Sequence, residues 1–378
     1  MSIQSAIWET GFSLVPSLTL TALSYIYLPL AALAFLLTAV NCLLIRTVRN
    51  IPALIENSVA ILIPMRNESR NVDGILGTAL SSKGLSRSEV IVYDDQSSDG
   101  TSELLKKYPV RVVRGETPPP GWLGKNNALA QLSRATDADF LVYLDADVRV
   151  TPHAIASAIS TMKTFGWDFI SPYPRQLSQT PLERLFQPLL QWSWLSSVPL
   201  RIAESGKFPS MVVANGQFFV VRRNAYQVIN GHDAIRSEVL DDLALAKELS
   251  KSGFRGSVAE GSRVAECRMY HSARELVDGY TKSLWRAFSN PVVAAIIALL
   301  LLATSVVPLI DGIRGYLVGW IGYTLVVLSR IISALRTRTI PNTALLHPLS
   351  ILILLYLLAL SFLRRSRGKL HWRGRSVS

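Results

Sequence analysis

The sequence is poor in residues that cross-link a chain or bind soft metals. Its 378 residues include two cysteines and five histidines. Cys42 falls inside a long apolar run and Cys267 lies far along the chain, so the pair does not suggest a disulfide or a cysteine-bound metal. Scarce cysteine agrees with a reducing compartment.

Charged residues are also scarce. They make up 17% of the chain, against 49% hydrophobic residues, and the mean hydropathy is +0.29. These values are unusual for a soluble protein and place part of the chain in lipid. Apolar runs near the ~20 residues needed to cross a bilayer occur at about 23–45, 292–310, 316–335 and 345–363. Between the first two lies a mixed segment of about 240 residues, the size of one α/β domain.

Basic residues are absent before the first apolar run, where the chain carries the acidic Glu9. We therefore expect residues 1–50 to form an uncleaved membrane anchor and not a signal peptide. Arg46 and Arg49 follow the run directly. The positive-inside rule then predicts a multi-pass protein of the cell membrane with a cytoplasmic domain.

The C-terminal region, residues 291–378, does not give one clear topology. Three full crossings would put the basic tail outside, yet the tail and the preceding loop both carry charge typical of the cytoplasmic side. These residues are Arg330, Arg336, Arg338, Arg364, Arg365, Arg367, Lys369, Arg373 and Arg375. The number of spans stays open, because one segment could be re-entrant or interfacial. We expect the basic clusters to meet anionic lipid headgroups and not nucleic acid.

The central segment alternates apolar strands with helices. Strands are predicted at 59–63, 90–93, 110–113 and 140–144, and helices at 72–80, 101–107 and 126–134. This pattern predicts a parallel sheet covered on both faces, with ligands bound beyond the carboxyl ends of the strands. Further on we expect paired strands at 211–214 and 218–221 and a helix at 241–250. Segments 182–200 and 275–289 fit helices on the membrane surface or ordinary core helices equally well.

Two carboxylates follow the strand at 140–144. Asp145 and Asp147 are one residue apart and would share a face of a regular strand. We expect no basic partner for them on that face. They would repel one another unless a cation lay between them. Oxygen ligands of this kind suit Mg²⁺ or Mn²⁺, although an isolated pair would more often be a solvated turn.

Other charged residues follow strand ends or open helices. Asp94 and Asp95 could accept hydrogen bonds from a nucleotide, whereas Asp99 fits a helix cap better. Lys125 follows a loop rich in proline and glycine and could meet a diphosphate at a helix start, or could simply be solvated. Asp241 and Asp242 open a helix, and one of them could serve as a general base.

Taken in order, these motifs resemble glycosyltransferase family 2, the inverting nucleotide-sugar enzymes with the GT-A fold. The resemblance covers about residues 58–290. It rests on Pro64-x-Arg66-Asn67-Glu68, Asp94-Asp95-x-Ser97-x-Asp99-Gly100, Gly121-Trp122-x-Gly124-Lys125, Asp145-Ala146-Asp147, Asn215-Gly216-Gln217 and Asp241-Asp242-x-x-Leu245. The branch it looks most like contains hopanoid-associated and carotenoid (chlorobactene-type) glycosyltransferases.

The resemblance implies an α/β GT-A domain at 51–290, with a nucleotide-binding half at about 58–147 and an acceptor half at about 148–290. By this resemblance the nucleotide would be uridine. The residues that would hold it are Pro64, Arg66, Glu68, Asp94 and Asp95. Lys125 would meet the diphosphate, Asp145 the ribose side, and Asp147 a divalent metal that Asp145 and His271 could help to bind. Asp242 would be the base, although Asp241 replaces the usual glutamate and leaves the choice between them open.

One motif of the family is missing. Processive members carry Gln-x-x-Arg-Trp after the base, but residues 280–286 here read Tyr-Thr-Lys-Ser-Leu-Trp-Arg. We therefore expect transfer of a single hexose, such as glucose, to a lipid acceptor. Carotenoids and other terpenoids fit the branch, and polyprenyl phosphate and diacylglycerol are alternatives. A transporter and a silent membrane scaffold are the non-enzyme alternatives; few intramembrane charges and intact carboxylates weigh against them.

Overall fold

The structure is a computed structural model, and it describes residues 20–288, 290–368, 371–372 and 375–376. Glu9, Ser289, Lys369 and Arg373 lie outside the described residues. Seven strands form the main sheet in the order β3-β2-β1-β4-β8-β6-β9. Their bounds are β1 Ile55–Met65, β2 Leu85–Asp94, β3 Arg111–Arg114, β4 Phe140–Leu144, β6 Phe169–Tyr173, β8 Phe218–Arg222 and β9 Gly256–Glu260. The four predicted strands of the nucleotide-binding half are confirmed.

The predicted parallel sheet is confirmed for the strands of the nucleotide-binding half, since β1 is parallel to β2 and β4, and β2 is parallel to β3. Beyond them the sheet is mixed, because β8 runs antiparallel to both β4 and β6. The predicted strand at 211–214 is wrong, because Pro209–Met211 forms the short 3₁₀ helix η1. Nearby, the Asn215 N–H and carbonyl form hydrogen bonds with the Ser171 hydroxyl of β6.

Helices cover both faces of the sheet, which explains the continuous apolar strands. Val59, Ile61 and Ile63 of β1 pack into one core with α2 (Val72–Leu80) and α5 (Ala154–Phe165). The alternate residues Ala60 and Leu62 pack into a second core with α4 (Gly124–Arg134) and α10 (Asp241–Lys251). α3 (Thr101–Leu105) and α9 (Arg223–Val228) extend the two cores. A small sheet, β5 (Val148–Val150), β10 (Ala265–Cys267) and β7 (Arg175–Gln176), lies beside them.

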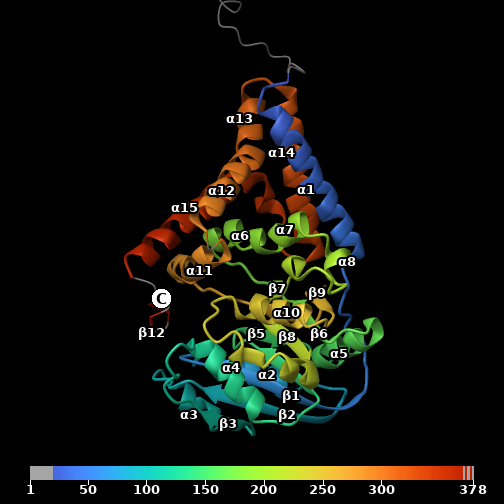
Figure 1. Cartoon of the computed structure of the whole chain (residues 1–378), viewed down its shortest axis with the longest axis vertical. Helices are drawn as coiled ribbons and strands as arrows, with labels where there is room; N and C mark the ends of the chain where they lie inside the picture. The colour runs from blue at the N-terminus through green and yellow to red at the C-terminus, as the bar shows by residue number, and fades with distance from the viewer. Residues whose placement is uncertain (1–19, 289, 369–370, 373–374, 377–378) are drawn as a thin grey trace, which may run out of the picture.

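A layer of short helices separates the sheets from the long apolar helices (Figure 1). It contains α6 (Pro181–Phe186), α7 (Pro188–Ser197), α8 (Leu200–Ala203) and α11 (Ala273–Phe288). The single helix expected at 182–200 is therefore broken, since a proline at position 188 opens α7 and Pro199 precedes α8. Trp192 of α7 donates a hydrogen bond to Ser329 at 2.8 Å, so this layer also packs against the apolar helices.

The described residues contain four segments long and apolar enough to cross a membrane. They are α1 (Ser24–Leu44), α12 with α13 (Pro291–Ser305 and Val307–Ile313), α14 (Leu317–Arg336) and η3 with α15 (Asn342–Leu346 and His347–Ser366). The four predicted apolar runs are thus all helical. α13 meets the start of α1 at the end far from the sheets, where Thr21 and Tyr27 donate to Asp311 (Figure 1).

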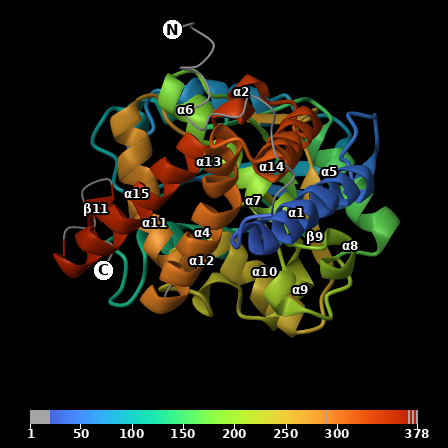
Figure 2. The same cartoon turned by 90° about the horizontal axis from the view of Figure 1, so that it is seen from above.

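α15 differs from the other three segments in its direction. Just before it, Thr343 donates to the Arg184 carbonyl of α6 at 2.8 Å. At its end, Arg364 pairs with Asp278 of α11 at 2.8 Å. Both neighbours belong to the layer next to the sheets, and Figure 2 shows α15 beside α11 and away from α1. The residues just before α15 and near its end therefore contact the layer next to the sheets, while His347 at its start also lies 3.0 Å from Ser305 of α12.

Candidate functional site

The predicted site residues gather at the carboxyl ends of β1, β2 and β4. Met65 and Asp94 are partners in the register of β1 and β2, and the Asp95 N–H donates to the Met65 carbonyl at 2.8 Å. Asp145 follows β4, and its N–H donates to the Gln217 carbonyl at 3.1 Å. The sheet thus brings the three polar clusters to one edge, as the strand pattern predicts.

Lys125 lies at the centre of this edge. It is the second residue of α4, and its Nζ is 3.1 Å from Asp145 Oδ1 and 3.3 Å from Asp241 Oδ2. Withdrawal from water lowers the pKa of the ammonium group, but Asp145, Asp241 and Asp242 together raise the pKa above its ordinary value. The group is therefore a permanent cation. Asp145 does have a basic partner, contrary to the sequence-based expectation, because the fold brings Lys125 to it.

Asp242 is held by backbone donors. Its Oδ2 accepts the Gly216 N–H at 2.6 Å, and its Oδ1 accepts the Leu243 N–H at 2.8 Å. A Cβ atom at Gly216 would lie 3.3 Å from the Asp242 Cβ and 3.4 Å from Lys125 Nζ, so the close approach favours glycine. Burial and the charge of Asp241 raise the pKa of Asp242 to about 6, against the opposing effect of Lys125. A carboxylate with a pKa in this range can both accept and release a proton near neutral pH.

Asp147 has the environment of a metal ligand. Its Oδ1 is buried and has no hydrogen-bond partner among the residues that the structure describes. Burial, Asp145 and Glu68 raise the pKa of this carboxyl to about 7. A buried oxygen without a partner and close to other acids suits a divalent cation better than solvent.

Few further protein ligands surround that position. Among the described residues, no group of three or more histidine, cysteine, aspartate or glutamate side chains could hold a metal ion. The backbone N–H of His271 donates to Glu275 Oε2 at 2.9 Å, and the ring Nδ1 lies 3.8 Å from the same oxygen, so the metal role of His271 stays a prediction. Mg²⁺ and Mn²⁺ sites often take waters and substrate phosphates for the remaining positions.

The expected nucleotide side is built from the loops after β1 and β2. Arg66 donates to the Asp95 carbonyl at 2.7 Å and lies 3.5 Å from its carboxylate. Pro64 is paired in register with Tyr93, and Glu68 accepts a hydrogen bond from Asn71 at 2.8 Å. These contacts join the loop after β1 to the loop after β2 through Arg66 and Asp95, and the nucleotide role of Pro64, Arg66, Glu68 and Asp95 stays a prediction.

Two acids of the β2 loop have structural partners. Asp94 accepts the Ser97 N–H at 3.1 Å and the Ser102 hydroxyl, so its carboxylate holds the loop. Asp99 accepts the Ser69 and Thr101 N–H groups. Although burial opposes it, these hydrogen bonds lower the pKa of Asp99 to about 2. The N-cap residue of α3 is Gly100, and Asp99, one position earlier, accepts the N–H of Thr101, the first residue of the helix. The nucleotide role of Asp94 stays a prediction.

Sequence reasoning assigned no role to Gly216 or to Asn126. The buried Asn126 amide donates to the backbone carbonyls of residues 235, 236 and 238 at 2.8, 3.2 and 2.9 Å. It thereby ties the start of α4, which carries Lys125, to the loop before Asp241 and Asp242. Its position directly after Lys125 is a sequence feature that could have indicated this role. A buried amide beside a charged site is usually hydrogen-bonded and holds the neighbouring backbone in place.

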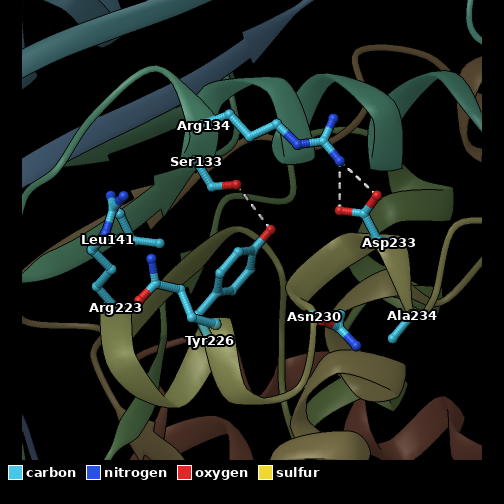
Figure 3. Close-up of a pocket in the computed structure, with 9 residues that line it drawn as sticks. Ser133, Arg134, Leu141, Arg223, Tyr226, Asn230, Asp233 and Ala234 are labelled. Atoms are coloured by element: carbon cyan, nitrogen blue, oxygen red, sulfur yellow. Dashed lines mark hydrogen bonds and ion pairs between the residues drawn. The ribbon is translucent and has the colours of Figure 1, made fainter.

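A cavity of about 500 Å³ lies away from this edge (Figure 3). It opens at the far end of α4, where Ser133 is 3.1 Å from the Tyr226 hydroxyl and Arg134 pairs with Asp233 at 2.6 Å. None of the residues lining it is a predicted site residue. We therefore treat the edge around Lys125, and not this cavity, as the candidate active site.

Comparison with known proteins finds sequences and a fold similar to those of this chain. The sequence profile described as Glycosyl transferase family 2 matches residues 60–229. A 4,4'-diaponeurosporenoate glycosyltransferase from Staphylococcus haemolyticus (strain JCSC1435) is 24% identical over 237 residues. That match covers 60% of this chain and 61% of the relative's length.

A solved structure shares the fold. It is the mannosyltransferase PcManGT from Pyrobaculum calidifontis in complex with GDP-Man and Mn²⁺. The superposition has a TM-score of 0.52 at 15% sequence identity and covers 91% of this chain and 99% of the other. The predicted GT-A-like α/β fold is thereby confirmed.

Proposed function

Because the Glycosyl transferase family 2 profile matches residues 60–229, we propose that this protein transfers one sugar from a nucleoside diphosphate sugar to a lipid in the membrane. The observation that carries the proposal is the single cluster of Asp242, Gly216 and Lys125. It puts a carboxylate with a pKa of about 6 next to a fixed cation at the carboxyl edge of the sheet. A base and a cation in the same cluster suit displacement of an anionic leaving group.

In this mechanism residues of the protein accept the proton and neutralise the negative charge of the leaving group. Asp242 takes the proton from an acceptor hydroxyl, whose oxygen bonds to the anomeric carbon. The bond from that carbon to the diphosphate breaks on the opposite face, so the configuration inverts. Lys125 neutralises the charge that develops on the departing diphosphate. For an acceptor carboxylate, already ionised, the base would not be needed.

A divalent ion fits the same site. Asp147, with Asp145 beside it, would hold the ion, which would supply further charge neutralisation at the diphosphate. The support is the buried Asp147 oxygen without a partner in the described part of the chain. The structural neighbour binds Mn²⁺ together with GDP-Man, which agrees with such a requirement.

The donor and the acceptor follow from the resemblance. A UDP-hexose such as UDP-glucose is the proposed donor. A carotenoid or another terpenoid is the proposed acceptor, because the curated relative is named for a carotenoid acid. Polyprenyl phosphate and diacylglycerol are the rival acceptors. Transfer stops after one sugar in this proposal, since residues 280–286 lack the Gln-x-x-Arg-Trp motif.

The proposed topology has three crossings, made by α1, by α12 with α13, and by α14. α15 then lies in the interface on the side of the domain. This arrangement is supported by the contacts of both ends of α15 with α6 and α11. It puts the domain, the loop with Arg336 and Arg338, and the end of α15 with Arg364 on one side, the cytoplasmic side, as the positive-inside rule requires.

Mass spectrometry of lipid extracts tests the function directly. Cells with the protein should contain a glycolipid that cells without it lack, and its mass identifies both sugar and acceptor. Asp147→Ala should abolish this lipid, whereas Asp137→Ala, a change at a surface acid paired with Arg223, should not. A scaffold or a transporter would leave the lipid profile unchanged and would show no hydrolysis of nucleotide sugar by the purified protein.

A further inference from the structure

Arg286 has a contact that the proposed chemistry leaves unexplained. It lies in the last turn of α11, a few residues before α12 begins. Its Nη2 is 3.0 Å from Glu238 Oε1, and its Nε is 3.3 Å from Glu238 Oε2. The two side chains are 33% and 39% exposed. A pair with two parallel contacts fixes orientation as well as distance.

Glu238 belongs to the loop at 235–240, which runs directly into Asp241 and Asp242. The opposite side of this loop is held by α4 and the residue before it. Asn126 donates to three of its carbonyls, and the Leu123 N–H donates to the carbonyl of residue 236 at 2.9 Å. The loop is therefore clamped between the start of α4, which carries Lys125, and the end of α11.

α11 is in turn attached to the apolar helices. The backbone N–H of Trp285 donates to the Ser361 hydroxyl of α15 at 3.0 Å, and the Arg365 guanidinium lies 3.9 Å from the centre of the Trp285 ring. Arg364 pairs with Asp278. A displacement of the membrane helices would thus move α11. The Arg286–Glu238 pair would transmit this movement to the loop at 235–240.

We infer that Arg286 is a positioning residue. It links the position of α11 against the membrane helices to the position of the Asp242 carboxylate. The inference rests on the proposed function. With the pair intact, the loop holds the start of α10 where Asp242 meets the Gly216 N–H. Without it, the start of α10 can shift. A shift of about 1 Å can cost about 10²-fold in rate, so we expect kcat to fall by about 10- to 100-fold.

The donor KM should change little, because the predicted nucleotide residues lie on the loops of β1 and β2. The test uses the full-length protein in lipid vesicles with Arg286→Gln, Glu238→Gln and the charge-swapped double variant Arg286→Glu/Glu238→Arg. Arg274→Gln is the matched control, since Arg274 is on the same helix, is 93% exposed and lies 3.9 Å from its acid partner Asp278. Both single variants should lose kcat, the double variant should regain most of it, and the control should match the wild type.

A second readout does not depend on activity. Hydrogen–deuterium exchange of the segment 235–242 should be faster in Arg286→Gln and unchanged in Arg274→Gln. Unchanged exchange together with unchanged kcat in Arg286→Gln would overturn the inference. So would equal losses of kcat and donor binding that the double variant does not repair, since these indicate general damage. If the wild type transfers no sugar, the proposed function fails, while the exchange comparison still tests the role of Arg286.

Discussion

At the scale of single residues, Asp242 connects the structure to a measurable pH dependence. Burial and Asp241 raise its pKa to about 6, and a base must be ionised to accept a proton. With a hydroxyl acceptor, kcat/KM should be level above this pKa and fall by about tenfold per pH unit below it.

Replacement of the base should remove that dependence. Asp242→Asn should lower kcat by about 10²- to 10⁴-fold and eliminate the acidic limb of the pH–rate profile. Asp137→Asn, at an exposed acid outside the site, should keep both rate and profile. An acidic limb that persists in Asp242→Asn would belong to another group and would contradict the assignment.

Asp147 allows a test by stability. Its pKa is raised to about 7, above the value of an exposed aspartate, so the folded state favours the neutral form. The stabilisation from that form is lost progressively as the pH rises from the ordinary pKa of 3.8 to about 7, and at pH 8 the loss is complete. Asp147→Asn should then raise the melting temperature by about 2–4 °C, which corresponds to about 1 kcal/mol.

The same variant should also lose its response to metal. Mn²⁺ with UDP should raise the melting temperature of the wild type, because binding to the folded state stabilises it, and should leave Asp147→Asn unchanged. Thermal unfolding at pH 8 with and without Mn²⁺ measures both effects. A variant that melts lower than the wild type, or that is still stabilised by Mn²⁺, would disagree with a metal site at Asp147.

The residues that the sequence identified are those whose chemistry is in the side chain. Lys125, Asp145 and Asp242 stand out as charges at strand ends or helix starts, and the fold does bring Lys125 to Asp145 and Asp241. The Gly216 backbone N–H donates to Asp242, which is 26 residues away. The Asn126 amide donates to a backbone carbonyl 109 residues away. Local patterns carry no information about such partners, so their roles required the structure.

At the scale of elements, hydropathy found the helices but not their direction. The apolar run at 345–363 is long enough to cross a membrane, and nothing in its composition distinguishes a crossing helix from an interfacial one. The proposed interfacial placement of α15 rests on contacts near its two ends. Thr343, just before α15, donates to the Arg184 carbonyl of α6, and Arg364 near its end pairs with Asp278 of α11.

The position of the C-terminal end can be measured. An epitope tag at the C-terminus should be digested by protease from the same side of sealed vesicles as the α/β domain, because α15 does not cross in the proposed topology. A tag inserted at Gly315, between α13 and α14, should be protected from that side. If both tags were accessible from the same side, α15 would be a full crossing.

Strand and helix types were predicted most reliably where a pattern repeats. The alternation of β1, α2, β2, α3, β3, α4 and β4 follows the predicted order. The errors lie beyond Asp147, where the chain leaves the repeating units. The antiparallel β8 depends on pairing with β4 and β6, and the breaks between α6, α7 and α8 depend on single prolines. Hydrophobic periodicity detects neither a strand pairing between distant segments nor a helix break at a single proline.

At the scale of the whole molecule, the proposed function needs access to both water and the bilayer. The candidate site lies at the edge of a sheet whose two faces are covered by helices, and a layer of short helices connects it with helices whose apolar side chains are exposed, including Leu299 and Ile313. An enzyme of this shape can take a soluble donor from water and an acceptor from the bilayer. Neither substrate has to leave its own solvent.

This arrangement makes a prediction about concentration. If the acceptor is drawn from the bilayer, the transfer rate should follow its mole fraction in the vesicle and not its bulk concentration. Dilution of vesicles at constant composition should then leave the rate per enzyme unchanged, whereas added inert phospholipid should lower it. The rate should still follow the bulk concentration of nucleotide sugar. A rate that falls on simple dilution of preformed vesicles would mean that the acceptor is taken from water, and the membrane-drawn acceptor would then be wrong.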